Sequence, residues 1–215
     1  GKIYPPEMME RVIVRLSEIP ETKVFVFGGG ASEQAYAERV AALRENVVSA
    51  IGRVRLGEEM ELISNLDLMV SMDSSALHMS SLVAVPVVSV WGATHPFAGF
   101  YGFGQDPSLA VQLDMACRPC SVYGNKPCLY GTYACMSGIP PEAIVEKCRP
   151  SATFRIGRAK TGRVRRARRR RDMEGTCPVG FLPVAGEMLL RGMRRSGGRS
   201  RDRVRRRLFR GNALA

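Results

Sequence analysis

The sequence predicts an α/β protein with a doubly wound parallel sheet, and two observations carry that prediction. Residues 23–27, 68–72 and 86–91 are short, nearly unbroken apolar runs, a pattern typical of strands buried on both faces of a sheet. Segments with helical spacing of apolar residues separate these runs. Alternation of strand and helix along a chain favours parallel strands covered by helices on both sides.

The individual elements follow from local patterns. Residues 6–17 place Met9, Val12, Ile13 and Leu16 at helical spacing behind a proline, which suits the first turn of a helix. The triple glycine 28–30 marks a turn after the first strand. The expected helices are 6–17, 31–43, 58–64, 76–83 and 140–147, and the expected strands are 23–27, 47–50, 68–72 and 86–91.

Charge divides the chain into two parts. The whole chain of 215 residues has a net charge of +12. Residues 1–148 carry 11 Lys or Arg against 16 Asp or Glu, a net charge of −5, whereas residues 149–215 carry 21 against 4, a net charge of +17. We therefore expect a folded domain over 1–148 and a basic low-complexity tail over 149–215, largely disordered, whose one apolar island is 175–191. No run of 18 apolar residues and no signal peptide is visible.

Polar residues follow the strand 68–72 directly. Asp73, Ser74 and Ser75 stand where that strand ends and the next helix begins, with His78 on the helix's first turn. Free amides and the positive end of the helix dipole make such a junction suited to anions. A lone histidine on an apolar helix is more often a core residue, but its spacing from Asp73 favours a binding role here.

The same stretch resembles glycosyltransferase family nine, the ADP-heptose:lipopolysaccharide heptosyltransferases. Residues 73–78 (DSSALH) resemble its D-[ST]-G-x-x-H motif, residues 85–88 its G-[VI]-P-[VT]-[VI] stretch, and residues 91–96 (WGATHP) its [FYW]-G-[PA]-T-[DS]-P stretch. Ser75 replaces the usual glycine and His95 the usual acid. The resemblance covers about residues 1–148.

The resemblance implies the Rossmann-like C-terminal domain of a GT-B glycosyltransferase. Lys2 of the K-x-W-P-like residues 2–5 would reach the donor diphosphate, and Glu33 the ribose. Asp73 would meet the sugar, the amides of Ser74 and Ser75 the phosphates, and His78 would support the same site. The catalytic base would lie on the family's N-terminal domain, so no catalytic residue is assigned in this chain. The resemblance implies no metal cofactor for catalysis.

For function, the resemblance implies transfer of a sugar from a nucleotide sugar, ADP-heptose above all, to a lipopolysaccharide core or another surface glycan. It also implies a cytoplasmic protein, and the basic tail, if it is native sequence, would bring the protein into peripheral contact with the inner face of the cytoplasmic membrane. Because only the C-terminal half of the family pattern is present, we expect a fragment without the acceptor domain that turns over little alone. A non-catalytic sugar-nucleotide sensor is a further alternative.

Four cysteines gather in a short segment rich in Pro, Gly and Tyr. The spacing Cys117-x2-Cys120-x7-Cys128-x6-Cys135 includes one C-x-x-C pair. Four thiolates suit a tetrahedral zinc or iron site, and four reduced, buried thiols are the alternative. We expect no catalytic cysteine in this segment.

Three explanations compete for the basic tail. It binds nucleic acid or an anionic membrane through phosphate neutralisation, it is a solvated tail without a specific partner, or it is the product of a shifted reading frame. The rival function for the whole chain is a nucleic-acid-binding protein that uses the tail and a metal knuckle formed by the four cysteines; otherwise nucleic acid is not an expected partner.

Overall fold

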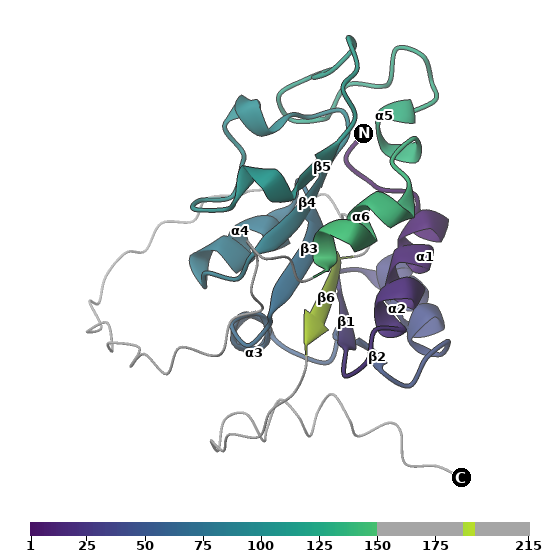
Figure 1. The fold of residues 1–215 in the computed structure, drawn as a ribbon, viewed down its shortest axis with the longest axis vertical. Helices are drawn as coiled ribbons and strands as arrows, with labels where there is room; N and C mark the ends of the chain where they lie inside the picture. Colours follow the sequence, from purple (N-terminus) through teal and green to yellow (C-terminus); the bar gives the residue numbers. More distant parts are fainter. Residues whose placement is uncertain (150–186, 192–215) are drawn as a thin grey trace, which may run out of the picture.

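A six-stranded sheet lies between two layers of helices (Figure 1). The computed structural model describes residues 1–149 and 187–191. The strands are β1 (Lys23–Phe27), β2 (Val47–Ser49), β3 (Leu68–Met72), β4 (Val87–Trp91), β5 (Ala110–Gln112) and β6 (Glu187–Arg191). The α-helices are α1 (Pro6–Ser17), α2 (Ala31–Ala41), α3 (Leu56–Ile63), α4 (Ser75–Leu82), α5 (Ala134–Ser137) and α6 (Pro141–Cys148), with short 3-10 turns at Pro96–Ala98 and Pro107–Leu109.

The strand order is β2-β1-β6-β3-β4-β5. The pairs β1–β2, β3–β4 and β4–β5 are parallel, as the sequence predicts. The carboxyl ends of β3 and β4 therefore meet at one edge of the sheet, with Met72 opposite Val90. In doubly wound sheets this edge is where ligands bind.

Strand β6 departs from the prediction, because it lies between β1 and β3 and is antiparallel to both. It comes from the apolar island 175–191, where a short apolar run gives no periodicity that distinguishes strand from helix. The sheet is consequently mixed rather than wholly parallel. The remainder of the predicted tail, 150–186 and 192–215, lies outside the described residues, so its predicted disorder stays a prediction, as do its predicted nucleic-acid and membrane contacts.

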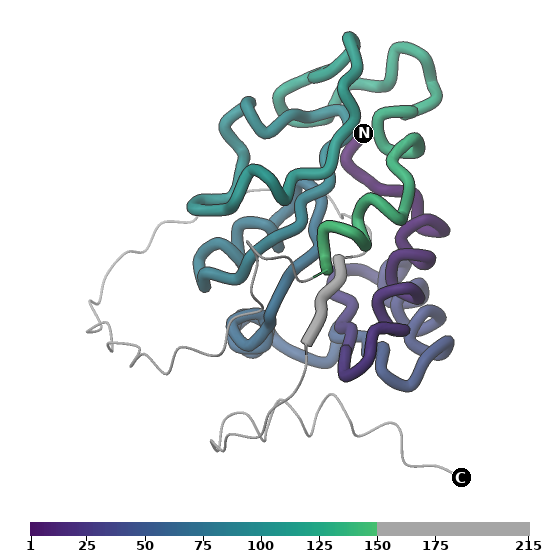
Figure 2. The backbone as a smooth tube through the Cα atoms, viewed as in Figure 1, coloured from purple at the N-terminus to yellow at the C-terminus, as the bar shows by residue number. Residues whose placement is uncertain are grey.

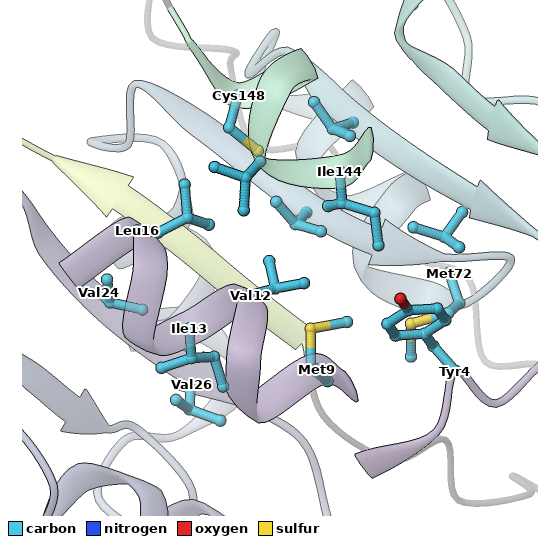
Figure 3. Packing of buried hydrophobic residues seen from close by; sticks show 14 of the residues in the cluster. Tyr4, Met9, Val12, Ile13, Leu16, Val24, Val26, Met72, Ile144 and Cys148 are labelled. Carbon is cyan, nitrogen blue, oxygen red and sulfur yellow. The ribbon is translucent and has the colours of Figure 1, made fainter. Parts of the chain in front are cut away.

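Alternate residues of the strands enter two separate cores. Val24 and Val26 of β1 face α1, α2 and α6, whereas Phe25 and Phe27 face α3 and α4. Figure 3 shows the first of these cores, where side chains of α1 and α6 interdigitate over the sheet. Because strands are buried on both faces, their sequences are continuously apolar rather than alternating. None of the helices in residues 1–149 has the length and apolar character needed to cross a bilayer.

The N-terminal segment runs along the edge of the sheet where the parallel strands β3 and β4 end. Figure 2 shows this end of the chain beside the loops that follow β4 and β5. The Ala93 amide donates to the Gly1 carbonyl over 2.9 Å, and the buried Tyr4 hydroxyl donates to the Ile139 carbonyl over 2.6 Å. These two anchors on either side fix Lys2 at the carboxyl ends of β3 and β4.

Candidate functional site

An ion pair between Lys2 and Asp73 forms the centre of the candidate site. Asp73 directly follows β3, and its Oδ2 lies 2.9 Å from Lys2 Nζ. The Asp73 side chain is 5% exposed, whereas that of Lys2 is 27% exposed. Oδ2 makes no hydrogen bond of acceptable geometry, so the contact is a close ion pair without a directed hydrogen bond. The ammonium thus keeps one side open toward solvent while it neutralises a buried carboxylate.

The amino end of α4 opens beside this pair. Ser74 is the N-cap residue with extended backbone, yet its side chain caps none of the helix amides. Its hydroxyl instead lies 3.0 Å from that of Ser71. The Ser74 side chain thus does not cap the first amides of α4, and this end of the helix adds its positive dipole end to the charge of Lys2. Such a combination favours an anion such as a phosphate.

Ser75 and His78 lie one turn apart on α4, and both are exposed. His78 is therefore not a core histidine, so of the two roles considered from the sequence, core packing and ligand binding, the first is excluded. The structure does not bring His78 into contact with Asp73, which is buried beneath the start of the helix. A ligand seated on the exposed face of this first turn would meet both side chains.

Glu33 lies at the same edge of the sheet but at a different strand. It is 5% exposed, on the first turn of α2 after β1, and its Oε2 accepts the Gly29 amide over 2.6 Å. Burial raises the pKa of Glu33, and the hydrogen bond from Gly29 partly offsets this effect. Since β6 separates β1 from β3, about two strand spacings of 4.8 Å lie between Glu33 and the Asp73 region. A ligand that contacts both must span about 10 Å, which is within reach of a nucleotide.

The loop after β4 adds residues that sequence reasoning missed or placed differently. Thr94 is 1% exposed, and its hydroxyl has no hydrogen-bond partner in the described part of the chain. His95 accepts the Phe97 amide at Nδ1 over 3.1 Å and caps the turn Pro96–Ala98. An acid at this position would accept the same amide, so His95 preserves the capping role.

Arg118 is the main functional-edge residue that the sequence analysis did not single out. Its guanidinium donates to the carbonyls of Gly92 and Leu113, to the Thr94 carbonyl over 2.9 Å and to Gln112 Oε1 over 3.1 Å. The sequence does single out this residue, because no other Lys or Arg occurs between positions 56 and 125. Arg118 therefore fastens the cysteine-rich loop to the ends of β4 and β5.

The cysteine-rich loop also reaches Lys2. A Cβ placed on Gly124, whose φ is +68°, would lie 2.9 Å from both Cγ and Cε of Lys2 and 3.1 Å from the methyl group of Thr94. Glycine is thus required both for the left-handed backbone and for the close approach. The loop packs directly against the aliphatic stem of the lysine that pairs with Asp73.

The four cysteines of this loop are free thiols in the structure. Cys117, Cys120 and Cys128 are partly exposed, whereas Cys135 is buried. Within the described ranges, no three Cys, His, Asp or Glu side chains are already arranged to hold a metal ion. The metal site predicted from their spacing therefore stays a prediction.

Comparison with known proteins connects this site to a family. Residues 1–128 match the family model described as glycosyltransferase family 9 (heptosyltransferase). The chain belongs to this family. The match includes Lys2, Glu33, Asp73 and the amino end of α4, so the predicted resemblance is confirmed.

Similar curated proteins are all heptosyltransferases. Lipooligosaccharide heptosyltransferase 2 of Campylobacter jejuni subsp. jejuni serotype O:6 is 25% identical over 157 residues, which cover 71% of this chain and 48% of that protein. The same-named protein of serotype O:2 is 26% identical over 130 residues, or 59% and 40%. Lipopolysaccharide heptosyltransferase 1 of Pseudomonas aeruginosa is 31% identical over 103 residues, or 47% and 27%. The chain thus spans less than half the length of these relatives, and no solved structure matches it significantly.

Proposed function

We propose that the family 9 domain is the donor-binding half of a GT-B glycosyltransferase that transfers a sugar from a nucleotide diphosphate sugar, ADP-heptose, to a hydroxyl of a lipopolysaccharide core or related surface glycan. The observation that carries this proposal is the Lys2–Asp73 pair, 2.9 Å apart beside the uncapped amino end of α4. Cation, carboxylate and helix amides meet there at the carboxyl ends of two adjacent parallel strands.

The chemistry of the donor assigns each residue a task. Negative charge grows on the diphosphate as the bond to the sugar breaks, and a fixed cation with helix amides stabilises that charge. Lys2 supplies the cation, and the amides of Ser74 and Ser75 supply the helix end. Asp73 orients the ammonium and contacts the sugar. Ser75 and His78, exposed on the first turn of α4, line the same site from the solvent side.

Glu33 binds the far end of the donor. Its position about two strand spacings from Asp73 matches the separation between the diphosphate and the ribose hydroxyls of a nucleotide. One carboxylate oxygen already accepts the Gly29 amide, so the other is available to accept a ribose hydroxyl. The nucleotide then lies across the edge of the sheet, from β1 to β3.

Among residues 1–149 and 187–191, we assign none as the base that removes the acceptor proton. The Asp73 carboxylate is paired with Lys2, so we assign it to orienting the ammonium and the sugar and not to removing the proton. In this proposal the base belongs to the acceptor-binding half of the enzyme. The proposed reaction uses no catalytic metal, because Lys2 and α4 supply the positive charge.

The setting of the reaction follows from its substrates. Nucleotide sugars are cytoplasmic metabolites, and a lipopolysaccharide core is built on a lipid anchor. We place the protein in the cytoplasm, in peripheral contact with the inner face of the cytoplasmic membrane. The acceptor is then a glycolipid presented at that face.

Calorimetric titration of the full 215-residue chain with ADP, UDP, GDP and ADP-heptose tests the proposal. The full chain is used because β6 completes the sheet. The expected result is preferential binding of ADP and ADP-heptose that is lost in Asp73→Asn, while Lys147→Ala, which alters an exposed lysine of α6, leaves affinity unchanged. Absence of nucleotide binding by a folded chain, or equal effects of the two variants, would contradict it.

A further inference from the structure

The segment 113–133 has an unusual construction for an ordered part of a domain. It joins β5 to α5 through 21 residues without a helix or strand. From position 112 to 134 not one residue is buried, and Val122, Leu129 and Tyr130 are largely exposed. Loops this long without secondary structure are uncommon in compact domains unless they have a function. Apolar burial does not hold this segment in place.

Hydrogen bonds secure only the start of the segment. Arg118 binds the ends of β4 and β5, and the Cys120 amide donates to the Ala93 carbonyl over 2.8 Å. Beyond position 120 the hydrogen bonds are local, such as Asn125 to Ser121 and Gly131 to Cys128. The second half of the loop therefore lacks an anchor that its backbone could provide.

The four cysteines are distributed over both halves of the loop and the start of α5. Cys135 lies within electrostatic range of Cys117, Cys120 and Cys128, so the four thiols are near one another, although within the described residues no three of them are arranged to hold a metal ion. Cys117 and Cys120 are joined by a tight turn in which Cys120 Sγ donates to the Cys117 carbonyl over 3.3 Å. One thiol pair therefore lies in the anchored half, and Cys128 and Cys135 bracket the other half.

Hydrogen-bond donors and a guanidinium lie close to the thiols. The backbone amides of Tyr133, Tyr130, Thr132 and Gly131 donate toward the Cys128 sulfur. Arg118 interacts with Cys135, Cys117 and Cys120. Amide donors to sulfur and a nearby guanidinium offset the negative charge that four thiolates around one divalent ion leave behind.

We propose that Cys117, Cys120, Cys128 and Cys135 bind one thiophilic divalent ion, zinc or iron, which ties the two halves of the loop together. Each thiol that binds releases its proton to solvent, and four thiolates around M²⁺ leave a complex of charge −2 beside Arg118. Binding draws the grouped thiols into a tetrahedral shell, and its free energy supplies the stability that the loop lacks in buried apolar surface.

This site would act on the candidate donor site through one contact. Gly124 lies between Cys120 and Cys128, two of the proposed metal ligands, and it packs against the stem of Lys2. Loss of the metal should make the loop around Gly124 more mobile and allow Lys2 to move away from Asp73. The link to the donor site depends on the proposed function, whereas metal binding itself does not.

Metal content and cobalt spectroscopy of the full chain test the inference. We expect one zinc or iron per chain by elemental analysis, and Co²⁺ titration should produce the sulfur-to-cobalt charge-transfer band and the visible bands of tetrahedral cobalt. Cys128→Ser and Cys117→Ser should abolish both signals. Cys148→Ser is the matched control, because this thiol is buried between α1 and α6 in the core (Figure 3), and Cys177→Ser controls for the remaining cysteine.

Variants that fail to fold are recognised by circular dichroism, and the wild-type chain treated with a chelator then supplies the metal-free state. Co²⁺ bound without thiolate charge transfer, metal content near zero in a freshly purified chain that also takes up no Co²⁺, or equal losses in Cys148→Ser and Cys128→Ser would each overturn the inference. ADP titration of the same samples separates the two proposals. Metal binding without ADP binding would support this inference and contradict the proposed function. ADP binding without metal binding would support the proposed function and contradict this inference.

Discussion

The Lys2–Asp73 ion pair should stabilise the fold measurably, unlike ion pairs on the surface. Opposite charges 2.9 Å apart attract by about 6 kcal/mol at an effective dielectric constant of about 20. Desolvation of the carboxylate, which is 5% exposed, offsets several kcal/mol of this attraction, and the 27% exposure of Lys2 admits solvent screening. We therefore expect a coupling free energy of about 1–2 kcal/mol between the two side chains.

A double-mutant cycle with Lys2→Met, Asp73→Asn and the double variant measures this coupling by urea denaturation. The pair between Arg15 and Glu142 is the matched control, since its atoms are 3.0 Å apart but both side chains are more than half exposed. The coupling free energy of the surface pair should be about 0–0.5 kcal/mol. Salt at about 1 M should remove this coupling, whereas the coupling between Lys2 and Asp73 should persist. Equal couplings, or a value below about 0.5 kcal/mol for Lys2 and Asp73, would refute the reasoning.

Three further predictions concern the neighbourhood of the site. Because burial raises the pKa of Glu33 above 4.5, the stability that Glu33 contributes is complete below that pH and is lost as the pH rises through the raised pKa. Denaturation measured at several pH values should show this loss of stability in the wild-type chain and not in Glu33→Gln. The control Glu45→Gln, at an exposed site, should keep the loss. Gly92→Ala should lower the free energy of unfolding by about 1–3 kcal/mol, since a Cβ there meets the Met136 side chain and the Gly1 carbonyl. The control for Gly92→Ala is Gly57→Ala in α3, which has open space around it and should instead raise the free energy of unfolding by about 0.5–1 kcal/mol. Arg118→Lys should speed amide hydrogen exchange in residues 113–126 because one ammonium cannot reach four acceptors; unchanged exchange would contradict its anchoring role.

The best-predicted parts of the fold are those where burial dictates the sequence pattern. Helix α1 and strands β1 and β3 begin and end at the predicted residues, because a helical stripe or an unbroken apolar run marks them. Strand β5 has only three residues and α5 only four, so neither carries a periodic signal. Strand β6 depends on pairing with β1 and β3, which are remote in sequence.

The places of the candidate-site residues in the fold were predictable, but their contacts were not. Asp73 follows a strand and precedes a helix, and this local order placed it correctly at the sheet edge. Its pairing with Lys2 depends on the anchors of the N-terminal segment, namely the Tyr4 hydroxyl and the Gly1 carbonyl, which join residues far apart in the chain. The buried, unpartnered hydroxyl of Thr94 and the anchoring by Arg118 have the same tertiary origin.

Calorimetric comparison of ADP with adenosine, in the wild-type chain and in Lys2→Met, tests the central claim most directly. The difference between the two ligands isolates the diphosphate, which we place between Lys2 and the amino end of α4. We expect ADP to bind at least about tenfold more tightly than adenosine, a difference of about 1.4 kcal/mol, and Lys2→Met to remove most of that advantage without weakening adenosine. If Lys2→Met weakens both ligands equally, or if adenosine binds as tightly as ADP, then the diphosphate does not lie at this edge of the sheet and the donor-site assignment is wrong.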